Sequence, residues 1–530
     1  MKINEWKKAR TYTSDQLDLA QVVLEEVRGG RRLDRALRSH PLPGGSLIPK
    51  HMLVAAYRRL VKEGVWKEDK AFLARIRMKP VRTLSGVTTV TVLTAPYPCP
   101  NNCLFCPTEE EMPKSYLRDE PGAARAFQNR FDPFDQVDSR LKEYEAVGHP
   151  TEKIELLILG ATWSAYPPDY QEDFIKRCYD AMNGRPSASL EEAQQRNETA
   201  RHRNVGLVIE TRPDMITPQE IRRLRRLGVT KVQMGAQSLD DLILALNHRG
   251  HTVAQTLQAT SLLRAGGFKI VLHWMPNLFG ATPESDEQDF ARLWEEGFAP
   301  DELKIYPTLL LENSDLYGKW KEGAYKPYTT GQLVELISNI KPSIPPYCRV
   351  NRVIRDIPST HVVEGNRRTS LRMDVSAELK RRGQTCRCIR CREVRTRKVL
   401  REELALDDYV YQAACAEEHF LSFVTADDHL AGYLRLSLPG KKAPDLGIED
   451  LAGAALIREV HVYGQSLPVG GEQTGAAQHI GLGTELLERA AAVAREQGYK
   501  RLTVIAAVGT RKYYEKRGFR RSDLYMVMDL

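Results

Sequence analysis

The sequence has 530 residues, of which 42% are hydrophobic and 28% are charged. A globular chain of this length is expected to divide into three or four domains, and its composition supplies enough apolar material for more than one core. No apolar run reaches the roughly 18 residues of a membrane span, and the basic N-terminus lacks the apolar stretch of a secretory signal. We therefore expect a cytoplasmic protein with no membrane partner.

Residues 1–80 are predicted to be helical, because the segments 13–27 and 49–64 place apolar residues at helical spacing. Residues 1–82 contain 19 Lys and Arg against 9 Asp and Glu, and residues 366–401 contain 13 against 3. The whole chain has a net charge of +8, so its remainder is acidic. Two basic segments on an acidic body indicate a nucleic-acid partner, because each neutralised phosphate releases a counterion. Solvated helix faces are the alternative.

From residue 81 to 345 the pattern alternates between short β-rich runs and amphipathic stretches. One of these stretches, 217–228, opens with a Thr cap and ends at Gly. The alternation predicts right-handed βαβ units and a parallel sheet, in a barrel or partial barrel. In such folds the chemistry gathers at the C-terminal ends of the strands. The predicted strands are 87–93, 153–160, 204–210, 231–237, 269–275 and 302–309.

Three cysteines follow the first predicted strand, in the segment TAPYPCPNNCLFCP. Cys99, Cys103 and Cys106 have the spacing Cys-x3-Cys-x2-Cys. Three thiolates in one short loop can each bind a different iron of a [4Fe–4S] cluster and leave the fourth iron open. S-adenosylmethionine (SAM) chelates an open iron of this kind before its reductive cleavage. The alternative is a zinc site with a fourth ligand from elsewhere. With Phe105 before the last cysteine, the motif resembles that of the radical SAM superfamily.

Further residues at predicted strand ends fit this resemblance. Gly160 ends the second strand, where radical SAM enzymes carry a small-residue turn near the SAM amino group. Glu210 and Arg212 end the third strand, and Gln233 and Gln237 lie in the fourth. Polar groups at these ends suit contacts to the ribose and methionyl parts of SAM, and ordinary helix capping is the alternative reading.

Residues 346–400 are predicted to form a basic linker with a second cysteine cluster. An odd total of nine cysteines, with no secretory signal, argues against a disulfide framework. The segment TCRCIRC holds Cys386, Cys388 and Cys391, which suit a structural zinc ion with one more ligand. Cys348 is the first choice for that ligand and His361 the second. Reduced surface thiols are the alternative.

Residues 401–530 are predicted to form a separate α/β domain. Strands are expected at 419–425, 431–438, 455–464 and 501–508, with helices at about 481–497 and 510–517. A Gly-rich turn with Gln478, Gly481 and Gly483 opens the first of these helices, and successive amides at a helix N-terminus can bind a pyrophosphate. The order of elements resembles the GNAT acetyltransferase fold, whose pyrophosphate loop binds coenzyme A.

This resemblance implies catalytic residues in the same domain. Tyr513 or Tyr514 takes the position from which GNAT enzymes often protonate the leaving thiolate, and His461 is expected to bind or polarise the thioester. Core packing of the paired tyrosines, with one hydroxyl exposed, is the alternative.

The combination of basic N-terminal helices, a radical SAM barrel and a GNAT domain resembles the Elongator protein 3 family in its stand-alone prokaryotic form. The resemblance covers nearly the whole chain. It is carried by CPNNCLFCP, VGLVIETRPD, QMGAQSL, NHRGHT, LKIYPTLL, REVHVYG, QHIGLGTELL and KYYEKRGF. It implies an enzyme that converts the wobble uridine of tRNA to 5-carboxymethyluridine with SAM and acetyl-CoA, and it makes the anticodon stem-loop the RNA partner. A homodimer and Elongator-like partner subunits are left open.

The resemblance also implies roles for individual residues. Cys99, Cys103 and Cys106 match the cluster ligands of the family, and Lys153 matches a lysine assigned to acetyl-CoA binding. The TCRCIRC cluster is a feature of prokaryotic members. The remaining acetyl-CoA contacts match Glu459, Val460, His461, Val462, Leu482, Gly483, Thr484, Glu485 and Tyr514.

Two other functions are alternatives to this one. A protein lysine acetyltransferase with a structural barrel would need a carboxylate base facing an amine channel, and Glu459 is a candidate. A non-catalytic RNA-binding protein would have no use for three clustered thiols at a strand end. Carbon 5 of uracil is not readily acylated, which explains why a radical-forming domain and a thioester-binding domain share one chain.

Overall fold

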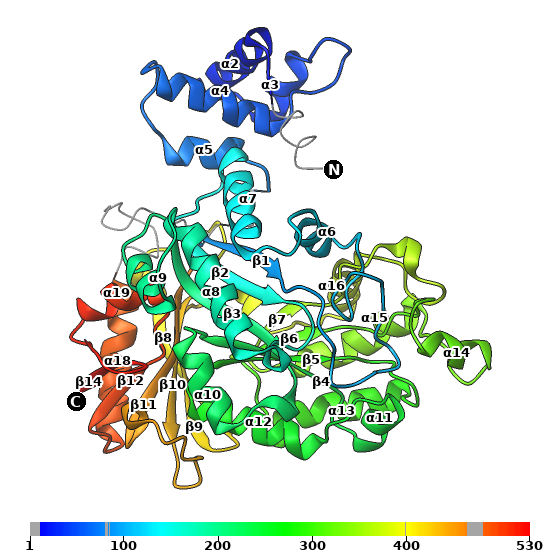
Figure 1. The fold of residues 1–530 in the computed structure, drawn as a ribbon. Helices are drawn as coiled ribbons and strands as arrows, with labels where there is room; N and C mark the ends of the chain where they lie inside the picture. The colour runs from blue at the N-terminus through cyan, green and yellow to red at the C-terminus, as the bar shows by residue number, and fades with distance from the viewer. Residues whose placement is uncertain (1–10, 80–82, 84, 398, 464–480) are drawn as a thin grey trace.

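The structure is a computed structural model that describes residues 11–79, 83, 85–397, 399–463 and 481–530. Figure 1 shows a helical N-terminal unit at one end of the molecule and, below it, two β-sheets that lie side by side. The first sheet belongs to the predicted barrel and the second to the predicted C-terminal domain.

The N-terminal unit has a hydrophobic core of its own, built from residues such as Leu24, Leu53 and Tyr57. Its first helix begins at a capping box, in which Thr13 and Gln16 each satisfy the other's backbone amide. An ion pair from Lys70 to Glu152, at 3.4 Å, connects this unit to the barrel. The helices are α2 (Ser14–Arg28), α3 (Leu33–Ser39), α4 (Lys50–Lys62) and α5 (Lys70–Ile76).

The barrel strands pair in parallel and in chain order, so the sheet is an open half-barrel with β1 and β7 at its edges. This confirms the predicted partial barrel. The strands are β1 (Val87–Leu93), β2 (Lys153–Leu159), β3 (Arg203–Thr211), β4 (Lys231–Gln237), β5 (Lys269–Trp274), β6 (Glu302–Ile305) and β7 (Arg349–Arg352).

The barrel helices are amphipathic, and several begin at a Thr or Asp cap, as in α10 after Thr217. The barrel helices are α6 (Pro121–Gln128), α7 (Pro133–Ala146), α8 (Pro168–Asn183), α9 (Leu190–Asn197), α10 (Pro218–Arg226), α11 (Asp241–Leu246), α12 (Val253–Ala265), α13 (Pro283–Glu295), α14 (Leu316–Lys321) and α15 (Thr330–Ile340). In Figure 1 several of them, among them α8, α10 and α12, lie over one face of the sheet.

The segment predicted as a linker is partly built into the barrel. Strand β7 (Arg349–Arg352) continues the parallel sheet next to β6, beyond the boundary expected at residue 345. With four residues, the strand is too short and too polar to give a clear strand pattern in the sequence. Helices α16 (Leu371–Arg381) and α17 (Ile389–Arg392) follow it.

The second sheet is mostly antiparallel, with strand order β13-β14-β12-β11-β10-β9-β8. Strands β11 and β12 are parallel neighbours, but they pair only from Ala454 to Ile457 on β11 and then separate. The elements are β8 (Leu404–Ala413), β9 (Ala416–Thr425), β10 (Leu430–Pro439), β11 (Ala454–Val462), α18 (Leu482–Glu496), β12 (Arg501–Val504), α19 (Arg511–Glu515), β13 (Arg520–Arg521) and β14 (Met526–Asp529).

Buried charges join the two sheets. Arg458 on β11 contacts both Asp301 of the barrel, at 2.7 Å, and Glu418 on β9, at 2.6 Å, and all three side chains are essentially inaccessible to solvent. Burial by itself would raise the pKa of Asp301, but Arg458 and Arg435 hold it well below its ordinary value. Loss of one partner would leave a charge buried without compensation, so this contact strongly favours one fixed arrangement of the sheets.

Candidate active site

One cavity of about 1010 Å³ extends from the carboxyl ends of the barrel strands to the second sheet. Cys106 lies in its wall on the barrel side, and Tyr514 lies in its wall on the side of the second sheet. Alternate residues of the barrel strands face it, because successive side chains of a strand point to opposite faces. On β6 the alternating set is Glu302, Lys304 and Tyr306.

The first cysteine cluster lies in the loop that follows β1. Cys103 is buried, and its sulfur is 3.6 Å from Nη1 of Arg249. A hydrogen bond from Cys106 and the Arg249 cation lower the pKa of the Cys103 thiol to about 5. Cys103 is therefore a thiolate at neutral pH, which is the form that binds a metal.

The arrangement of these thiols fits a polynuclear cluster better than a zinc ion. A tetrahedral zinc site with bonds of about 2.3 Å holds its sulfur ligands about 3.8 Å apart. Cys99, Cys103 and Cys106 do not form such a set, whereas the linker cysteines do, with all ligand atoms within 4.8 Å of one another. In this first set Cys106 hydrogen-bonds to Cys103, whereas Cys99 lies beside Thr162, 3.8 Å from its Oγ1, so three thiols of one loop are present without converging on a single ion. The residues present therefore fit a [4Fe–4S] cluster.

Gly160 occupies a place where no other residue fits. Its φ of 127° disfavours L side chains, and a Cβ added to it would lie 1.9 Å from Oγ1 of Thr94. Its carbonyl oxygen accepts hydrogen bonds from Thr94 Oγ1 at 3.2 Å and from the Tyr166 hydroxyl at 3.1 Å. The end of β2 is thereby held against the start of the cysteine loop.

Glu210 and Gln237 both line the cavity, as predicted for strand-end polar groups. Glu210 accepts a hydrogen bond of 3.5 Å from Tyr116, which lies shortly after the cysteines. Gln237 has a left-handed backbone with φ of 69°, and its Oε1 is buried without a hydrogen-bond partner in the described part of the chain. Such an acceptor is available to a ligand.

Arg212 acts on the site through another arginine. It is 2% exposed, forms an ion pair with Asp214 at 2.9 Å, and donates a hydrogen bond of 2.8 Å to the carbonyl of Arg249. Arg249 then donates to the Gly235 carbonyl at 2.7 Å and approaches Cys103. Arg249 lies within the segment NHRGHT, but no role for it was predicted from the sequence.

The middle of the cavity holds a polar group of which only Gln233 was singled out from the sequence. Lys304 and the Nε2 of His273 both donate hydrogen bonds to Oε1 of Gln233, the latter at 3.2 Å. The His273 ring packs edge-on against Tyr306, with centroids 5.4 Å apart. The alternation of Glu302, Lys304 and Tyr306 along one strand is the signal that identifies the inward face.

Below this group, five side chains of alternating charge cross the cavity wall. Lys231 contacts Glu155 at 2.6 Å and Glu302 at 3.4 Å, while Lys269 contacts Glu302 at 3.4 Å and also pairs with Glu459. These contacts lead from β2 across the barrel to β11. They link the barrel wall to the strand predicted to bind acetyl-CoA.

Glu459 is fully engaged in this chain. Besides Lys269, it contacts Arg435 at 3.0 Å and accepts a hydrogen bond of 2.9 Å from the Tyr433 hydroxyl. Burial would raise its pKa, but Lys269 and Arg435 hold it well below the ordinary value. Burial lowers the pKa of His461 to about 4, so this imidazole is neutral near pH 7. Glu459, Val460 and His461 all line the cavity.

Helix α18 begins at the predicted Gly-rich turn. Gly481 caps it in the left-handed conformation, with φ of 77°. The side chain of Leu482 packs in the core, Thr484 Oγ1 accepts from Arg517 at 3.3 Å, and Glu485 pairs with Arg401 at 2.7 Å. The amides of Thr484 and Glu485 donate to the Gly481 carbonyl at 2.8 and 3.2 Å, so in the described part of the chain the amides of Gly481, Leu482 and Gly483 are left for a ligand. Gln478 lies outside the described residues.

The two adjacent tyrosines have different surroundings. Tyr514 lines the cavity, and burial raises its pKa well above the ordinary value. Tyr513 lies outside the cavity lining among the described residues: its hydroxyl would be 2.7 Å from a Cβ on Gly483, and Arg517 lies 3.6 Å above its ring. The geometry therefore separates a cavity-facing tyrosine from one that packs on α18.

Two other residues predicted to bind acetyl-CoA lie at the edges of the site. Lys153 begins β2 beside Arg203, and burial together with Arg203 lowers its pKa. Arg203 in turn packs against Gly509 of the second domain. Val462 ends β11 opposite Gly432. Neither Lys153 nor Val462 is among the described residues that line the cavity.

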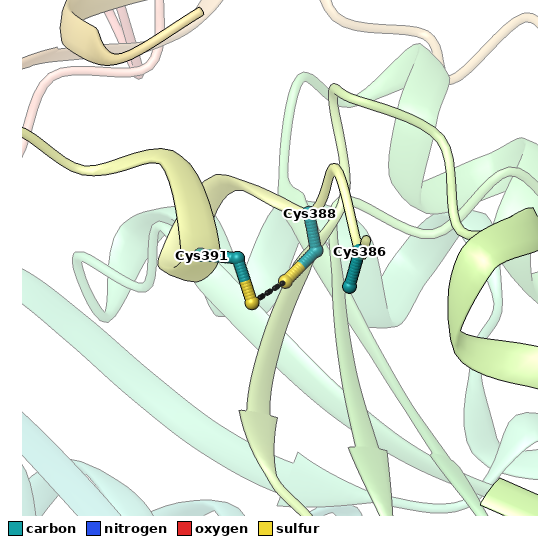
Figure 2. Close-up of side chains that lie close together, drawn as sticks. All are labelled: Cys386, Cys388 and Cys391. Carbon is teal, nitrogen blue, oxygen red and sulfur yellow. Dashed lines mark hydrogen bonds between the residues drawn. The ribbon is translucent and has the colours of Figure 1, made fainter. Parts of the chain in front are cut away.

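The linker cysteines Cys386, Cys388 and Cys391 converge, as Figure 2 shows. The sulfurs of Cys388 and Cys391 are 3.6 Å apart. Hydrogen bonds from the other two thiols and the nearby Lys341 cation lower the pKa of Cys388. Three thiols at this spacing fit a tetrahedral zinc ion.

Neither residue suggested as the fourth zinc ligand joins this set. Cys348 is completely buried on the adjoining strand, and its carbonyl, rather than its sulfur, contacts the cluster segment through the amide of Ile389 at 2.9 Å. His361 contacts Asp119 at 2.6 Å. The described residues therefore provide three ligands and leave the fourth position to another group.

The helices in the described part of the chain include none that is long and apolar enough to cross a membrane.

Comparison with known protein families finds matches in both sheets of the structure. Residues 97–293 match the radical SAM superfamily, residues 300–381 match the radical SAM C-terminal domain, and residues 474–529 match the acetyltransferase (GNAT) domain. The second match includes β7, in agreement with its place in the barrel sheet.

Similar proteins cover most of the chain. A tRNA uridine(34) acetyltransferase of Dehalococcoides mccartyi is 45% identical over 85% of this chain and 99% of its own length. One from Methanocaldococcus jannaschii is 39% identical over 95% and 96%. Human Elongator complex protein 3 is 36% identical over 86% and 87%. The solved structure of the archaeal Methanocaldococcus infernus Elp3, with residues 1–46 deleted, is 38% identical, covers 84% of this chain and all of that one, and has a TM-score of 0.73.

Proposed function

The chain belongs to the family that comprises the tRNA uridine(34) acetyltransferases and Elongator complex protein 3, and on this basis we propose that it forms 5-carboxymethyluridine at the wobble position of tRNA. Its co-substrates are SAM and acetyl-CoA. The observation that carries the proposal is the continuous cavity, with Cys106 on the barrel side and Tyr514 on the side of the second sheet. A radical and a thioester can meet inside it without crossing solvent.

At the barrel end, Cys99, Cys103 and Cys106 would hold a [4Fe–4S] cluster. A cluster held there would, with SAM, supply the radical chemistry for removing a hydrogen atom from the acetyl methyl group; this carbon would then replace the hydrogen on carbon 5 of uracil, which leaves as a proton while the remaining electron returns to the cluster, and water would release CoA. Arg249 holds Cys103 in its thiolate form. We assign the ribose and methionyl contacts of SAM to Glu210 and Gln237, with Arg212 as their support through Arg249 and with Gly160 at the amino group.

At the other end, the amides from Gly481 to Gly483 would bind the pyrophosphate of acetyl-CoA, with Thr484 and Glu485 completing the turn. The segment Glu459–Val462 would bind the acyl arm where β11 and β12 separate. Lys153 would contribute charge from the edge of the barrel. His461, which is neutral, would donate to the thioester carbonyl, and Tyr514, which stays protonated, would protonate the departing thiolate.

The two basic segments would bind the tRNA. The N-terminal unit, residues 1–80, and the linker, residues 346–400, carry the excess of Lys and Arg. The wobble base has to leave the stacked anticodon loop to enter the cavity. In the linker, Cys386, Cys388 and Cys391 would hold a zinc ion that keeps this basic surface in shape. We place the protein in the cytoplasm.

The proposed domain boundaries follow the predicted ones, with the radical SAM domain at 81–345 and the GNAT domain at 401–530. Strand β7 makes the first part of the intervening linker structurally continuous with the barrel.

The rival function, protein lysine acetylation, depends on Glu459 as a general base. A base has to take up a proton near the working pH. Glu459 instead holds two cations and a hydroxyl, and its pKa is well below the ordinary value. This observation favours the radical mechanism over direct acetyl transfer to an amine.

The test is an anaerobic reaction of the reconstituted protein with reductant, SAM, acetyl-labelled acetyl-CoA and unmodified tRNA, followed by mass spectrometry of the nucleosides. We expect label in 5-carboxymethyluridine, and none when Cys103→Ala protein is used. Label on protein lysines alone, with the RNA unmodified, would overturn the proposal.

A further inference from the structure

Lys304 is a buried cation that the proposed binding sites for SAM and acetyl-CoA do not use. It lies in the middle of β6, its side chain is in the cavity wall, and the residue is 8% exposed. In the described part of the chain its ammonium donates one hydrogen bond, to Oε1 of Gln233, and lies 5.7 Å above the Tyr306 ring. An ammonium has three N–H donors. The other two N–H donors of Lys304 face the cavity, where a ligand could supply their acceptors.

Lys304 lies between the predicted SAM site and the predicted acetyl-CoA site of the cavity. On one side, Lys304 bonds to Gln233, the register partner of Glu210, which accepts a hydrogen bond from Tyr116 shortly after the cysteines. On the other side, Glu302 lies two residues before Lys304 on the same strand and contacts Lys269, the partner of Glu459. Lys304 is thus connected to both predicted cofactor sites, and a third reactant that has to meet both the radical and the thioester would lie beside it.

The hydrogen-bonding capacity of Lys304 is of one kind, because an ammonium can only donate. Uracil presents an acceptor at its C4 carbonyl next to a donor at N3. Cytosine presents the reverse, an amino donor at C4 and an acceptor at N3. A donor-only cation matches the first base and opposes the second.

We propose that Lys304 is a specificity-determining residue that donates to the C4 carbonyl of the uracil base in the cavity and thereby excludes cytosine. Gln233 and His273 hold the ammonium in place. This assignment rests on the proposed function, because it takes the wobble base as the occupant. Burial lowers the pKa of Lys304 to about 8, which agrees with an amine that lacks full solvation until a ligand binds.

The test compares two anticodon stem-loops that differ only in the wobble base, U or C. Their dissociation constants are measured by fluorescence anisotropy with protein that carries its cluster, SAM and acetyl-CoA, without reductant. We expect the wild type to prefer U by about ten-fold, the effect of one well-placed hydrogen bond in a buried site. Lys304→Met should bind the two RNAs about equally, mainly through weaker binding of the U form.

Two further variants guard against a merely structural effect. Lys304→Arg keeps the hydrogen-bond donors and should retain part of the preference for U. If Lys304→Met lost this preference only because it misfolds, restoring the donors would not be expected to restore the preference. Lys176→Met removes a partly buried lysine that pairs with Asp180 at 3.0 Å on α8, away from the described cavity lining, and should leave the preference unchanged.

The outcomes separate the alternatives. Retention of the U preference by Lys304→Met, or a wild type without preference, would overturn the inference. A loss of SAM affinity by ten-fold or more in Lys304→Met, with the base preference intact, would assign the lysine to the SAM carboxylate instead. Failure of the proposed function would appear separately, as absence of 5-carboxymethyluridine from the U stem-loop in the reduced wild-type reaction.

Discussion

Lys269 on barrel strand β5 and Glu459 on β11 of the second sheet form an ion pair in the wall of the shared cavity. The lysine side chain is 16% exposed and the glutamate 8%. Glu302 lies 3.4 Å from the same ammonium. The pair therefore fixes the strand that would bind acetyl-CoA against the wall of the barrel.

Replacing Lys269 by Met should loosen this connection. Glu459 would keep Arg435 but lose its second cation, and a buried carboxylate with incomplete pairing costs about 2–4 kcal/mol of stability. We expect a lower thermal midpoint and a KM for acetyl-CoA raised by about ten-fold, with SAM cleavage in the absence of RNA little changed. Lys142→Met, which removes an exposed partner of Asp138, is the control. An unchanged KM would show that the pair does not position the thioester.

Gly160→Ala should abolish binding of SAM. The new methyl group would lie 1.9 Å from Thr94 Oγ1, so β1 and β2 would have to separate where the cysteine loop starts. Gly184→Ala is a matched control, because Gly184 also has a positive φ, of 72°, but has nothing within 4 Å of the added atom. That variant should lose only about 1 kcal/mol from backbone strain. Calorimetric titration of SAM measures the difference, and equal affinities in the two variants would contradict it.

Tyr514→Phe should slow release of CoA by about a hundred-fold, the usual contribution of a positioned general acid. Tyr513→Phe should have little effect, since the Tyr513 hydroxyl lies over Gly483 outside the described cavity lining. Thiol release from acetyl-CoA in the presence of tRNA is the measurement. If CoA release were slower in Tyr513→Phe than in Tyr514→Phe, Tyr513 would be the general acid instead.

Substitution of a linker cysteine should remove one metal ion that is distinct from the iron. Cys388→Ser breaks the linker set, and we expect loss of one zinc per chain by atomic emission with the iron content unchanged. Cys178→Ser changes a buried thiol outside that set and should keep the zinc. Equal zinc contents in both variants would show that the linker cysteines do not hold it.

Asp286 should make the folded barrel less stable as the pH rises. Burial raises its pKa from 3.8 to about 7, so between these values the unfolded chain releases a proton that the folded chain keeps. Its stabilising effect is complete below about pH 4 and is lost as the pH rises through 7, at most about 4 kcal/mol. Asp286→Asn keeps an acceptor for the Asn277 amide and Tyr328 hydroxyl without the charge. It should raise the thermal midpoint at pH 8 but not at pH 4, and equal gains at both would contradict this.

The sequence by itself predicted many of the strands and helices and the candidate residues at the two ends of the cavity, although strand β7 was not among them. Strand β1 was predicted to the residue, and β4 likewise, because apolar runs bounded by turns are local signals. The cysteines, Gly160 and the Gly481 turn were found because their chemistry requires a fixed spacing or a missing side chain within a few residues.

Only the tertiary structure decided how these ends are connected. Lys304, Arg249 and the Lys269–Glu459 pair carry no local signature, since a lysine or an arginine in a sequence is more often solvated than buried. Their roles arise because parallel strands bring residues far apart in the chain to one wall, where burial makes each charge depend on its partner. The same reason separates Tyr514 from Tyr513: neighbours in sequence on one short helix point in different directions, and only one meets the cavity.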